Sequence, residues 1–305
     1  MSLALLCSGQ GRQDRDSFSL LADAPAAVPA FAAAAAILGD HPANFCRTAP
    51  IATLHANREG QILCVTRALA AAAALFPNGV PADTIVAGYS VGEMAAWGIA
   101  GVWPPAETLR LVDHRARSMD VAGGPDDQLA YVRGLPRGTV ERLAERFGCA
   151  IAIVNPDRLF IVGGPRSAAE ALCAAALREG AARAAPMAVH VASHTPRLAG
   201  AVAPFAAALA AIPTQRPTLR LMTASGATLV SRPQQALAGL AGQVAETIDW
   251  AELLEALGER GVTRILELGP GRALADMAAA VLPIAEVRAL DDFRGLAGAR
   301  AWLTA

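Results

Sequence analysis

Short apolar segments alternate with long alanine-rich segments along this 305-residue chain, and the alternation limits the folds that are open to it. Residues 3–7, 84–88 and 264–268 are runs of strand length that end at or just before a glycine. Residues 17–38 and 58–76 have the length and composition of helices. Strands that alternate with helices are typical of a parallel sheet covered by helices on both faces. The sequence therefore predicts an α/β fold.

The glycine- and proline-containing segment Gly123-Gly124-Pro125-Asp126-Asp127 predicts that a second unit is inserted into this fold. After it, strand and helix patterns follow the order βαββαβ, which is typical of a ferredoxin-like unit. The predicted strands span 129–132, 150–154, 159–162 and 184–189, and the predicted helices span 137–147 and 167–179. We therefore expect a large α/β domain of residues 1–124 and 190–305, and a small subdomain of residues 125–189.

Charge and cysteine usage exclude several classes of protein. The 26 basic and 27 acidic side chains give a net charge of −1, without the basic excess that nucleic-acid binding needs. The five cysteines are scattered and odd in number, which favours reduced thiols over disulfides or a zinc site. The N-terminus lacks a basic region, and no apolar run reaches the roughly 18 residues of a membrane span. We expect a cytoplasmic protein that binds neither nucleic acid nor membranes.

A candidate nucleophile lies where a predicted strand meets a predicted helix. Gly88-Tyr89-Ser90-Val91-Gly92 fits the pattern G-x-S-x-G, whose glycines relieve crowding in a sharp strand-to-helix turn. Such a turn exposes the serine hydroxyl at the carboxyl end of the sheet, and the next backbone N–H, that of Val91, points to where an oxyanion would form. The alternative is an ordinary glycine-rich turn, but the strand–turn–helix context favours a catalytic serine.

A catalytic serine needs a base, and the chain offers five histidines: His41, His55, His114, His190 and His194. His194 lies in Ser193-His194-Thr195-Pro196, just before a predicted helix, where a loop could present it to the site; by itself, such a histidine is more often a loop or capping residue. His190 and His194 have the i, i+4 spacing of a metal pair. Residues 189–192 are, however, predicted to be a strand end or loop, and no third ligand follows nearby, so we expect no metal site.

Several segments spread over nearly the whole chain form one ordered set of motifs. They are Ser8-Gly9-Gln10-Gly11-Arg12-Gln13, Gly88-Tyr89-Ser90-Val91-Gly92-Glu93, Arg115-Ala116-Arg117-Ser118-Met119, Val191-Ala192-Ser193-His194, the stretch from Gln243-Val244 to Trp250, and Glu267-Leu268-Gly269-Pro270-Gly271. In order and spacing, the set resembles the malonyl-CoA:acyl-carrier-protein transacylase family. The first four correspond to that family's G-Q-G-x-Q, G-H-S-x-G-E, R-G-x-x-M and V-x-S-H.

The chain departs from this family pattern at defined positions. Tyr89 replaces the usual histidine before the serine, Cys7-Ser8 replaces Phe-Pro, Ala116 replaces a glycine, and Ala245-Glu246 replace Tyr-Asn. The elbow with Tyr89, together with Cys-Ser-Gly-Gln-Gly, is most similar to the epsilon subunit of malonate decarboxylase. That subunit is a transacylase that moves malonyl onto a dedicated carrier protein.

The resemblance implies an α/β-hydrolase-like core and assigns the catalytic roles. Ser90 would attack the thioester, and His194 would accept its proton and return one to the departing thiolate. The backbone N–H groups of Gln10 and Val91 would form the oxyanion hole. Arg115 would bind the free carboxylate of malonate bidentately.

The resemblance also implies several supporting residues. The spacing to Met119 selects Arg115 over Arg117. The backbone near Gln243 would orient the histidine, and Asn155 resembles a family asparagine beside it, although Asn155 could equally be a turn residue. Glu93 suits the positive end of the helix after the elbow, and no chemistry is assigned to it. Tyr89 could line the acyl pocket or shield the histidine.

We therefore expect an enzyme that moves malonyl from malonyl-CoA to a phosphopantetheine-type thiol of an acyl carrier protein by a ping-pong mechanism, without a cofactor. The expected partner is the malonate decarboxylase carrier, with other subunits of that complex as possible partners. Four alternatives stay open: a malonyltransferase of fatty-acid or polyketide synthesis, a serine thioesterase, a transferase of a neutral acyl group, and a non-catalytic docking subunit. A thioesterase would want an acid between Ser90 and His194, where the small subdomain is predicted.

Overall fold

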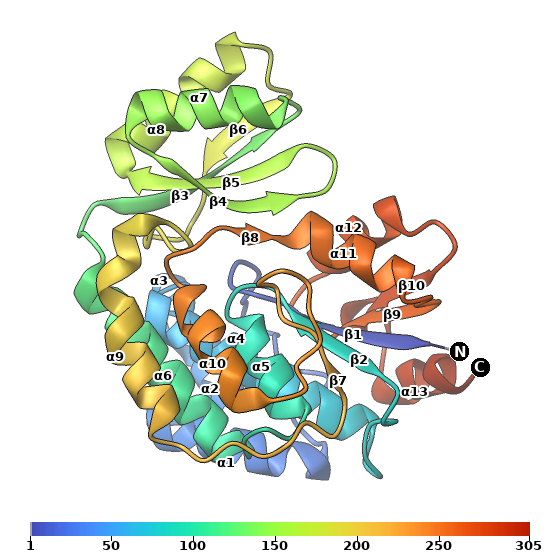
Figure 1. Cartoon of the computed structure of the whole chain (residues 1–305). Coiled ribbons are helices and arrows are strands. Elements are labelled where there is room, and N and C mark those ends of the chain that lie inside the picture. Colours follow the sequence, from blue (N-terminus) through green and yellow to red (C-terminus); the bar gives the residue numbers. More distant parts are fainter. Residues whose placement is uncertain (1) are drawn as a thin grey trace.

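The larger sheet of the molecule is parallel, as the alternation of segments predicts. A computed structural model describes residues 2–305, and within them this sheet has five strands in the order β10-β9-β1-β2-β7 (Figure 1). Its strands are β1 (Leu3–Cys7), β2 (Ile85–Gly88), β7 (Arg220–Leu221), β9 (Arg264–Glu267) and β10 (Glu286–Ala289). Every pair in the sheet is parallel. The carboxyl ends of its strands therefore meet at one edge, where ligands of α/β proteins commonly bind.

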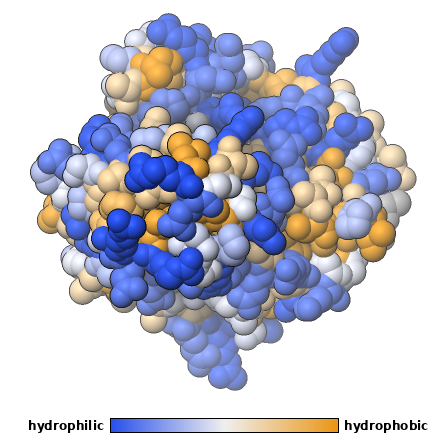
Figure 2. Space-filling view, turned by 90° about the horizontal axis from the view of Figure 1, so that it is seen from above, coloured by the Kyte–Doolittle hydropathy of each residue, from blue (hydrophilic) through white to orange (hydrophobic). Residues whose placement is uncertain are grey.

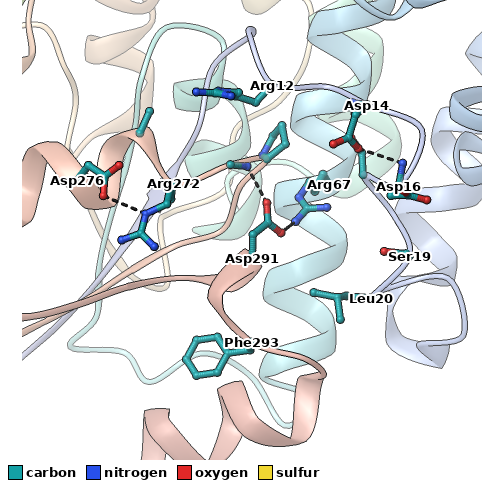
Figure 3. A pocket seen from close by; sticks show the side chains of 14 residues that line it. Arg12, Asp14, Asp16, Ser19, Leu20, Arg67, Arg272, Asp276, Asp291 and Phe293 are labelled. Carbon is teal, nitrogen blue, oxygen red and sulfur yellow. Dashed lines mark hydrogen bonds and ion pairs between the residues drawn. The ribbon is translucent and has the colours of Figure 1, made fainter.

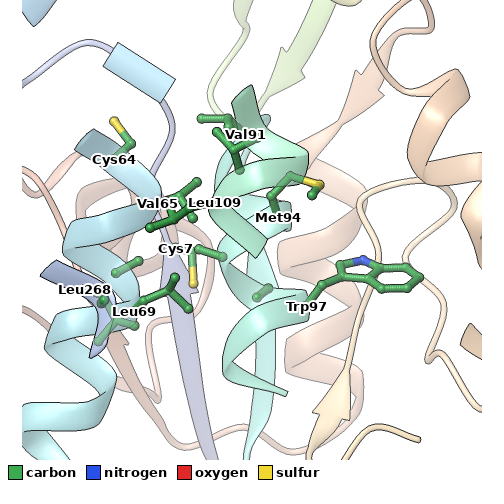
Figure 4. Packing of buried hydrophobic residues seen from close by; sticks show 14 of the residues in the cluster. Cys7, Cys64, Val65, Leu69, Val91, Met94, Trp97, Leu109 and Leu268 are labelled. Carbon is green, nitrogen blue, oxygen red and sulfur yellow. The ribbon is translucent and has the colours of Figure 1, made fainter. Parts of the chain in front are cut away.

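Helices cover both faces of this sheet. Alternate residues of β1 point to opposite sides, so that Leu5 and Cys7 join one core cluster and Ala4 and Leu6 another. The helices of the first cluster are α1 (Val28–Leu38), α4 (Asn57–Leu75), α5 (Gly92–Ile99), α6 (Pro105–Ala122) and α9 (Ala199–Ala210), and those of the second are α11 (Trp250–Glu259) and α12 (Ala273–Val281). Figure 4 shows side chains of the first cluster between the sheet and its helices, among them Cys7 on β1, Leu69 on α4 and Met94 on α5.

A second sheet forms the small domain at the top of Figure 1. Its order is β6-β3-β5-β4-β8, and β3, β4, β5 and β6 pair antiparallel. The elements are β3 (Asp127–Arg133), α7 (Arg137–Phe147), β4 (Ala150–Asn155), β5 (Leu159–Pro165), α8 (Arg166–Arg178), β6 (Arg183–Pro186) and β8 (Ile248–Asp249). The first six follow the predicted order βαββαβ, and α7 and α8 pack on one face. The predicted fold class is thus confirmed.

The remaining elements are short or lie at the periphery. They are the helices α2 (Pro42–Thr48), α3 (Ile51–Leu54), α10 (Pro233–Gly242) and α13 (Leu296–Thr304), and the 3₁₀ helices Pro25–Ala27, Pro196–Leu198 and Leu290–Asp292. In the described part of the chain, residues 2–305, no helix is both long enough and apolar enough to cross a membrane. Hydrophilic residues cover most of the face seen in Figure 2, and hydrophobic ones show there in separate groups.

Two sequence predictions differ from the observed elements. The helix predicted over 17–38 is wrong for its first part, because the helix begins at Val28 and residues 15–23 form turns. Pro25 explains this: proline has no N–H and disfavours helical geometry in the residue before it. The strand predicted over 184–189 ends earlier, at Pro186, although the N–H of Met187 still donates to the carbonyl of Leu129 and the N–H of Leu129 to that of Val189.

Candidate active site

The turn after β2 holds Ser90 in a strained conformation. Its φ is 55°, in the left-handed region that side chains other than glycine rarely adopt. Gly88 and Gly92, on either side of Ser90, leave no room for a side chain. A Cβ on Gly92 would lie 2.1 Å from the carbonyl oxygen of Cys7, and one on Gly88 would lie 2.1 Å from the backbone of Gly92. The strand, the turn and α5 are therefore packed backbone against backbone, which fixes where the hydroxyl points.

Ser90 and His194 form a hydrogen-bonded pair. The distance from Ser90 Oγ to His194 Nε2 is 2.7 Å, and that from His194 Nδ1 to the carbonyl oxygen of Gln243 is 2.6 Å. A carbonyl oxygen can only accept, so Nδ1 carries the proton and Nε2 is left to accept from the serine hydroxyl. The backbone N–H of His194 also donates to the carbonyl of Val244, at 2.9 Å. The pair thus has the geometry of a nucleophile and its general base.

The environment keeps His194 neutral. The side chain is fully buried, and burial lowers the pKa of His194 to about 3, with the positive charge of Arg115 as a second cause. The hydrogen bond to the Gln243 carbonyl opposes this shift. The imidazole is therefore in its base form at neutral pH, as proton acceptance from Ser90 requires.

Two backbone N–H groups next to Ser90 have unused hydrogen-bonding capacity. Within residues 2–305, the N–H groups of Val91 and Gln10 donate to no other group. Val91 begins the turn into α5, and Gln10 lies in the loop after β1. That loop runs against the elbow, because a Cβ on Gly9 would lie 3.5 Å from the Cβ of Ser90. The Gln10 side chain donates to two carbonyls at the start of α4, at 3.3 Å each, which holds the loop in place.

Arg115 on α6 is a buried cation with an unused donor. It is 2% exposed, and its Nη1 donates to Oε1 of Gln61 at 2.5 Å. Nη2 is also buried, and in the described residues 2–305 it finds no partner. Burial lowers the pKa of Arg115 to about 10, and the nearby charge of Glu93 opposes this, so the guanidinium stays charged. A buried guanidinium with an open N–H is suited to binding an anionic group.

Arg117 is excluded from this position by its exposure. Its side chain is 60% exposed and pairs with Asp113 at 2.8 Å on the surface of α6. Two residues along a helix point to different sides, so only one of the two arginines can face the core. The structure brings Arg115, not Arg117, to the interior beside His194, whose pKa it lowers.

Sequence reasoning missed the part that Glu93 plays. Instead of only serving the start of α5, its carboxylate is buried and accepts from Gln243 Nε2 at 2.6 Å and from the N–H of Ala224 at 2.9 Å. Burial raises the pKa of Glu93 to about 7, while these hydrogen bonds oppose the shift. Glu93 thus anchors the segment whose carbonyl orients His194. The sequence feature that could have indicated this role is the position of Glu93, a carboxylate directly after Gly92 in an otherwise apolar helix.

Asn155 and Tyr89 interact with each other. Asn155 ends β4, is buried, and within residues 2–305 makes no hydrogen bond to His194. Its amide instead lies beside the Tyr89 phenol. Burial raises the pKa of Tyr89, and Asn155 opposes the shift. The Tyr89 ring packs edge-on against Trp250, with ring centres 5.3 Å apart. Tyr89 therefore joins the elbow to the second core cluster.

A cavity of about 560 Å³ opens beside the site, between α3, the start of α4 and residues 188–191. Its polar lining residues are His55, Asn57, Asp120 and His190, and Ile51, Val189 and Val191 are among its apolar ones. None of the predicted catalytic side chains lines it, but the carbonyl of Asn57 accepts from the Gln10 side chain, which connects the cavity to the loop that carries a candidate oxyanion donor.

Another cavity, of about 740 Å³, lies at the same edge of the sheet (Figure 3). Its charges pair with each other, for example Arg67 with Asp291, and Arg272 with Asp276 at 3.0 Å. None of the predicted catalytic side chains lines it. Among residues 2–305, no three His, Cys, Asp or Glu side chains are grouped so that they could hold a metal ion.

The chain is similar in sequence and in structure to known acyl transferases. A family model described as "Acyl transferase domain" matches residues 5–254. The malonyl CoA-acyl carrier protein transacylase of Escherichia coli K12 is 27% identical over 97% of this chain and 98% of its own length. The solved acyl-carrier-protein S-malonyltransferase of Burkholderia pseudomallei has a TM-score of 0.91 at 25% identity, covering 99% of this chain and all of that one. A malonyl-transacylase solved with a type II PKS acyl-carrier protein has a TM-score of 0.92 at 25% identity, over 99% of each chain.

Proposed function

The chain belongs to the acyl transferase domain family, and from this relationship we propose that it moves a malonyl group from malonyl-CoA to the thiol of an acyl carrier protein. The relative in Escherichia coli is named for this activity, and one solved relative is a malonyl-transacylase in complex with an acyl-carrier protein. The observation that supports malonyl in particular is the buried Nη2 of Arg115, which lacks a partner within residues 2–305.

The first half-reaction acylates Ser90. The hydroxyl proton passes from Oγ to Nε2 of His194 as Oγ attacks the thioester carbonyl, and the N–H groups of Gln10 and Val91 receive the negative oxygen. When the C–S bond breaks, the proton on Nε2 goes to the departing thiolate of CoA. An ester on Ser90 and free CoA result, and His194 is neutral again.

The free carboxylate of the malonyl group binds Arg115. A bare carboxylate in a buried site is costly, and a guanidinium with an open N–H offsets that cost. The same contact would offset the positive charge that helps to lower the pKa of His194. Malonyl binding thus makes His194 a stronger base at the moment when it must take the serine proton.

The second half-reaction reverses the first with another thiol. The carrier's thiol gives its proton to Nε2, the sulfur attacks the ester carbonyl, and the Ser90 Oγ–carbonyl bond breaks. Oγ then takes the proton back from His194, so that malonyl ends on the carrier and the enzyme is regenerated. The cavity beside Asn57 and His190 offers a route for the arm that carries the thiol.

For the acceptor, we propose the carrier protein of malonate decarboxylase. The sequence supports this through Tyr89 and Cys7-Ser8, which depart from the common family pattern toward the epsilon subunit of that enzyme. Discharge of the malonyl-enzyme by this carrier and not by a fatty-acid carrier is the expected result. Faster discharge by a fatty-acid or polyketide carrier would place the chain with those pathways.

Intact-protein mass after brief mixing with malonyl-CoA tests the first half-reaction. Wild-type protein should gain one malonyl group, less with acetyl-CoA, and Ser90→Ala should gain none. Ser118→Ala, which keeps Ser90, serves as the matched control. Consumption of malonyl-CoA to free malonate without an adduct would overturn the proposal in favour of a thioesterase, and neither adduct nor consumption would favour a docking subunit.

A further inference from the structure

Gln61 is a fully buried polar side chain that connects Arg115 to the start of α4. Its Oε1 accepts from Nη1 of Arg115 at 2.5 Å, and its Nε2 donates to Oδ1 of Asn57 at 2.7 Å. Nε2 also lies 3.4 Å from the sulfur of Met119. Most of α4 around Gln61 is buried, and an amide in such a place is retained only where it has partners.

Asn57 fixes which way the Gln61 amide points. Its Nδ2 donates to the carbonyl oxygen of Ala116 at 3.1 Å and to the Asp120 carboxylate at 2.9 Å. Both partners are acceptors, so Asn57 must turn its NH₂ group toward them and its oxygen toward Gln61. Gln61 then presents its NH₂ group to Asn57 and its oxygen to Arg115. The amide cannot turn over without losing hydrogen bonds at both ends.

We propose that Gln61 is the positioning residue that makes the site selective for acyl groups with a free carboxylate. It holds one amino group of the guanidinium, so that the other, Nη2, is left for the substrate. It does so with a neutral oxygen, so the charge of Arg115 is not used up inside the protein. This inference rests on the proposed function, because it concerns how Arg115 recognises malonyl.

The contrast with a carboxylate shows why neutrality matters. Arg58 and Arg67 pair with Asp113 and Asp291, and those aspartates take up the positive charge. A glutamate at position 61 has nearly the shape of glutamine but would form the same kind of ion pair with Arg115. It would then compete with the malonyl carboxylate for the guanidinium. An acetyl group, which has no carboxylate, would be indifferent to that competition.

The test compares malonyl-CoA and acetyl-CoA as donors for acylation of Ser90 in the full chain. For Gln61→Glu we expect the malonyl rate to fall about 10²-fold or more and the acetyl rate to change less than about fivefold. Gln61→Met, which keeps the volume but removes the amide, should lower the malonyl-to-acetyl ratio less, by about tenfold. The matched control is Gln128→Glu, the same change at a buried glutamine of β3, which should leave the ratio unchanged.

The ratio separates selectivity from folding, since a variant that folds poorly loses both activities together. An unchanged ratio in Gln61→Met and Gln61→Glu, with wild-type protein acylated by malonyl-CoA, would overturn the role of Gln61 and leave the proposed function standing. Should Gln61→Glu fail to fold, the ratio in Gln61→Met decides. If wild-type protein forms no malonyl adduct, the proposed function fails and this inference fails with it.

Discussion

Main-chain atoms hold the Ser90–His194 pair, whereas side-chain amides hold Arg115. His194 is oriented by the carbonyls of Gln243 and Val244, and Ser90 by a turn in which backbone packs on backbone. Arg115, by contrast, donates to the side chain of Gln61. The two regions lie close enough for Arg115 to influence the pKa of His194.

The two regions should respond differently to substitutions. A geometry that backbone atoms define depends on turns and on glycines that allow close approach, so it survives the replacement of many neighbouring side chains. A geometry that side chains define is lost when one of them changes. We therefore expect the catalytic pair to lose activity only when its own side chains are removed. Recognition of the carboxylate should also be lost when a side chain behind Arg115, such as that of Gln61, is replaced.

Removing the base should have the largest effect. In His194→Ala we expect acylation of Ser90 by both malonyl-CoA and acetyl-CoA to fall roughly 10⁴- to 10⁶-fold, as for the loss of a nucleophile's partner in other serine enzymes. Rapid-quench measurement of acyl-enzyme formation checks this. His114→Ala, at an exposed histidine of α6, is the control. Loss of malonyl transfer alone would mean that the pair does not act on both acyl groups.

Removing the guanidinium of Arg115 should lower the rate of acylation by malonyl-CoA much more than the rate with acetyl-CoA. In Arg115→Ala the malonyl rate should fall about 10²- to 10³-fold, because a buried carboxylate loses its charged partner. The acetyl rate should change little beyond any loss of folded protein. The same donors given to Arg117→Ala should show no change, because that side chain is exposed. Equal losses for malonyl and acetyl in Arg115→Ala would contradict the recognition role.

The sequence predicts the backbone-held region well because its determinants are local. The glycines around Ser90, the run before them and the helix after them all lie within a few consecutive residues, and together they specify a strand–turn–helix unit. The family resemblance, which the comparison confirms, links this unit to His194 and Arg115. The malonate decarboxylase assignment stays a prediction.

The side-chain-held region was harder to predict because its contacts join distant parts of the chain. Gln61 and Arg115 are 54 residues apart, and Glu93 and Gln243 are 150 apart. No local pattern marks a buried glutamine as the partner of a particular arginine. The addition of β8 to the small sheet is similar, since it pairs Ile248 with Ile153 across nearly 100 positions. Such pairings follow from tertiary packing and not from propensity.

The electrostatic link between the two regions should appear in the titration of His194. Burial and Arg115 lower its pKa to about 3, so NMR of the imidazole should show no proton uptake between pH 8 and pH 5. In Arg115→Gln the midpoint should rise but stay below 6.5, because burial is the larger cause. The unfolded imidazole titrates near 6.5. The stability that neutral His194 contributes should thus be lost as pH falls from about 6.5 toward 3. A wild-type midpoint near 6.5 would contradict the link.

The smallest effect on the chemistry should come from Gln243→Ala. The variant keeps the carbonyl that accepts from His194 and loses only the amide that donates to Glu93. We expect acylation by both donors to fall less than about tenfold, with an unchanged malonyl-to-acetyl ratio. Urea unfolding should show a loss of about 1–3 kcal/mol, because a buried carboxylate loses a donor. A loss of activity as large as in His194→Ala would mean that side chains, and not the backbone, hold the catalytic pair.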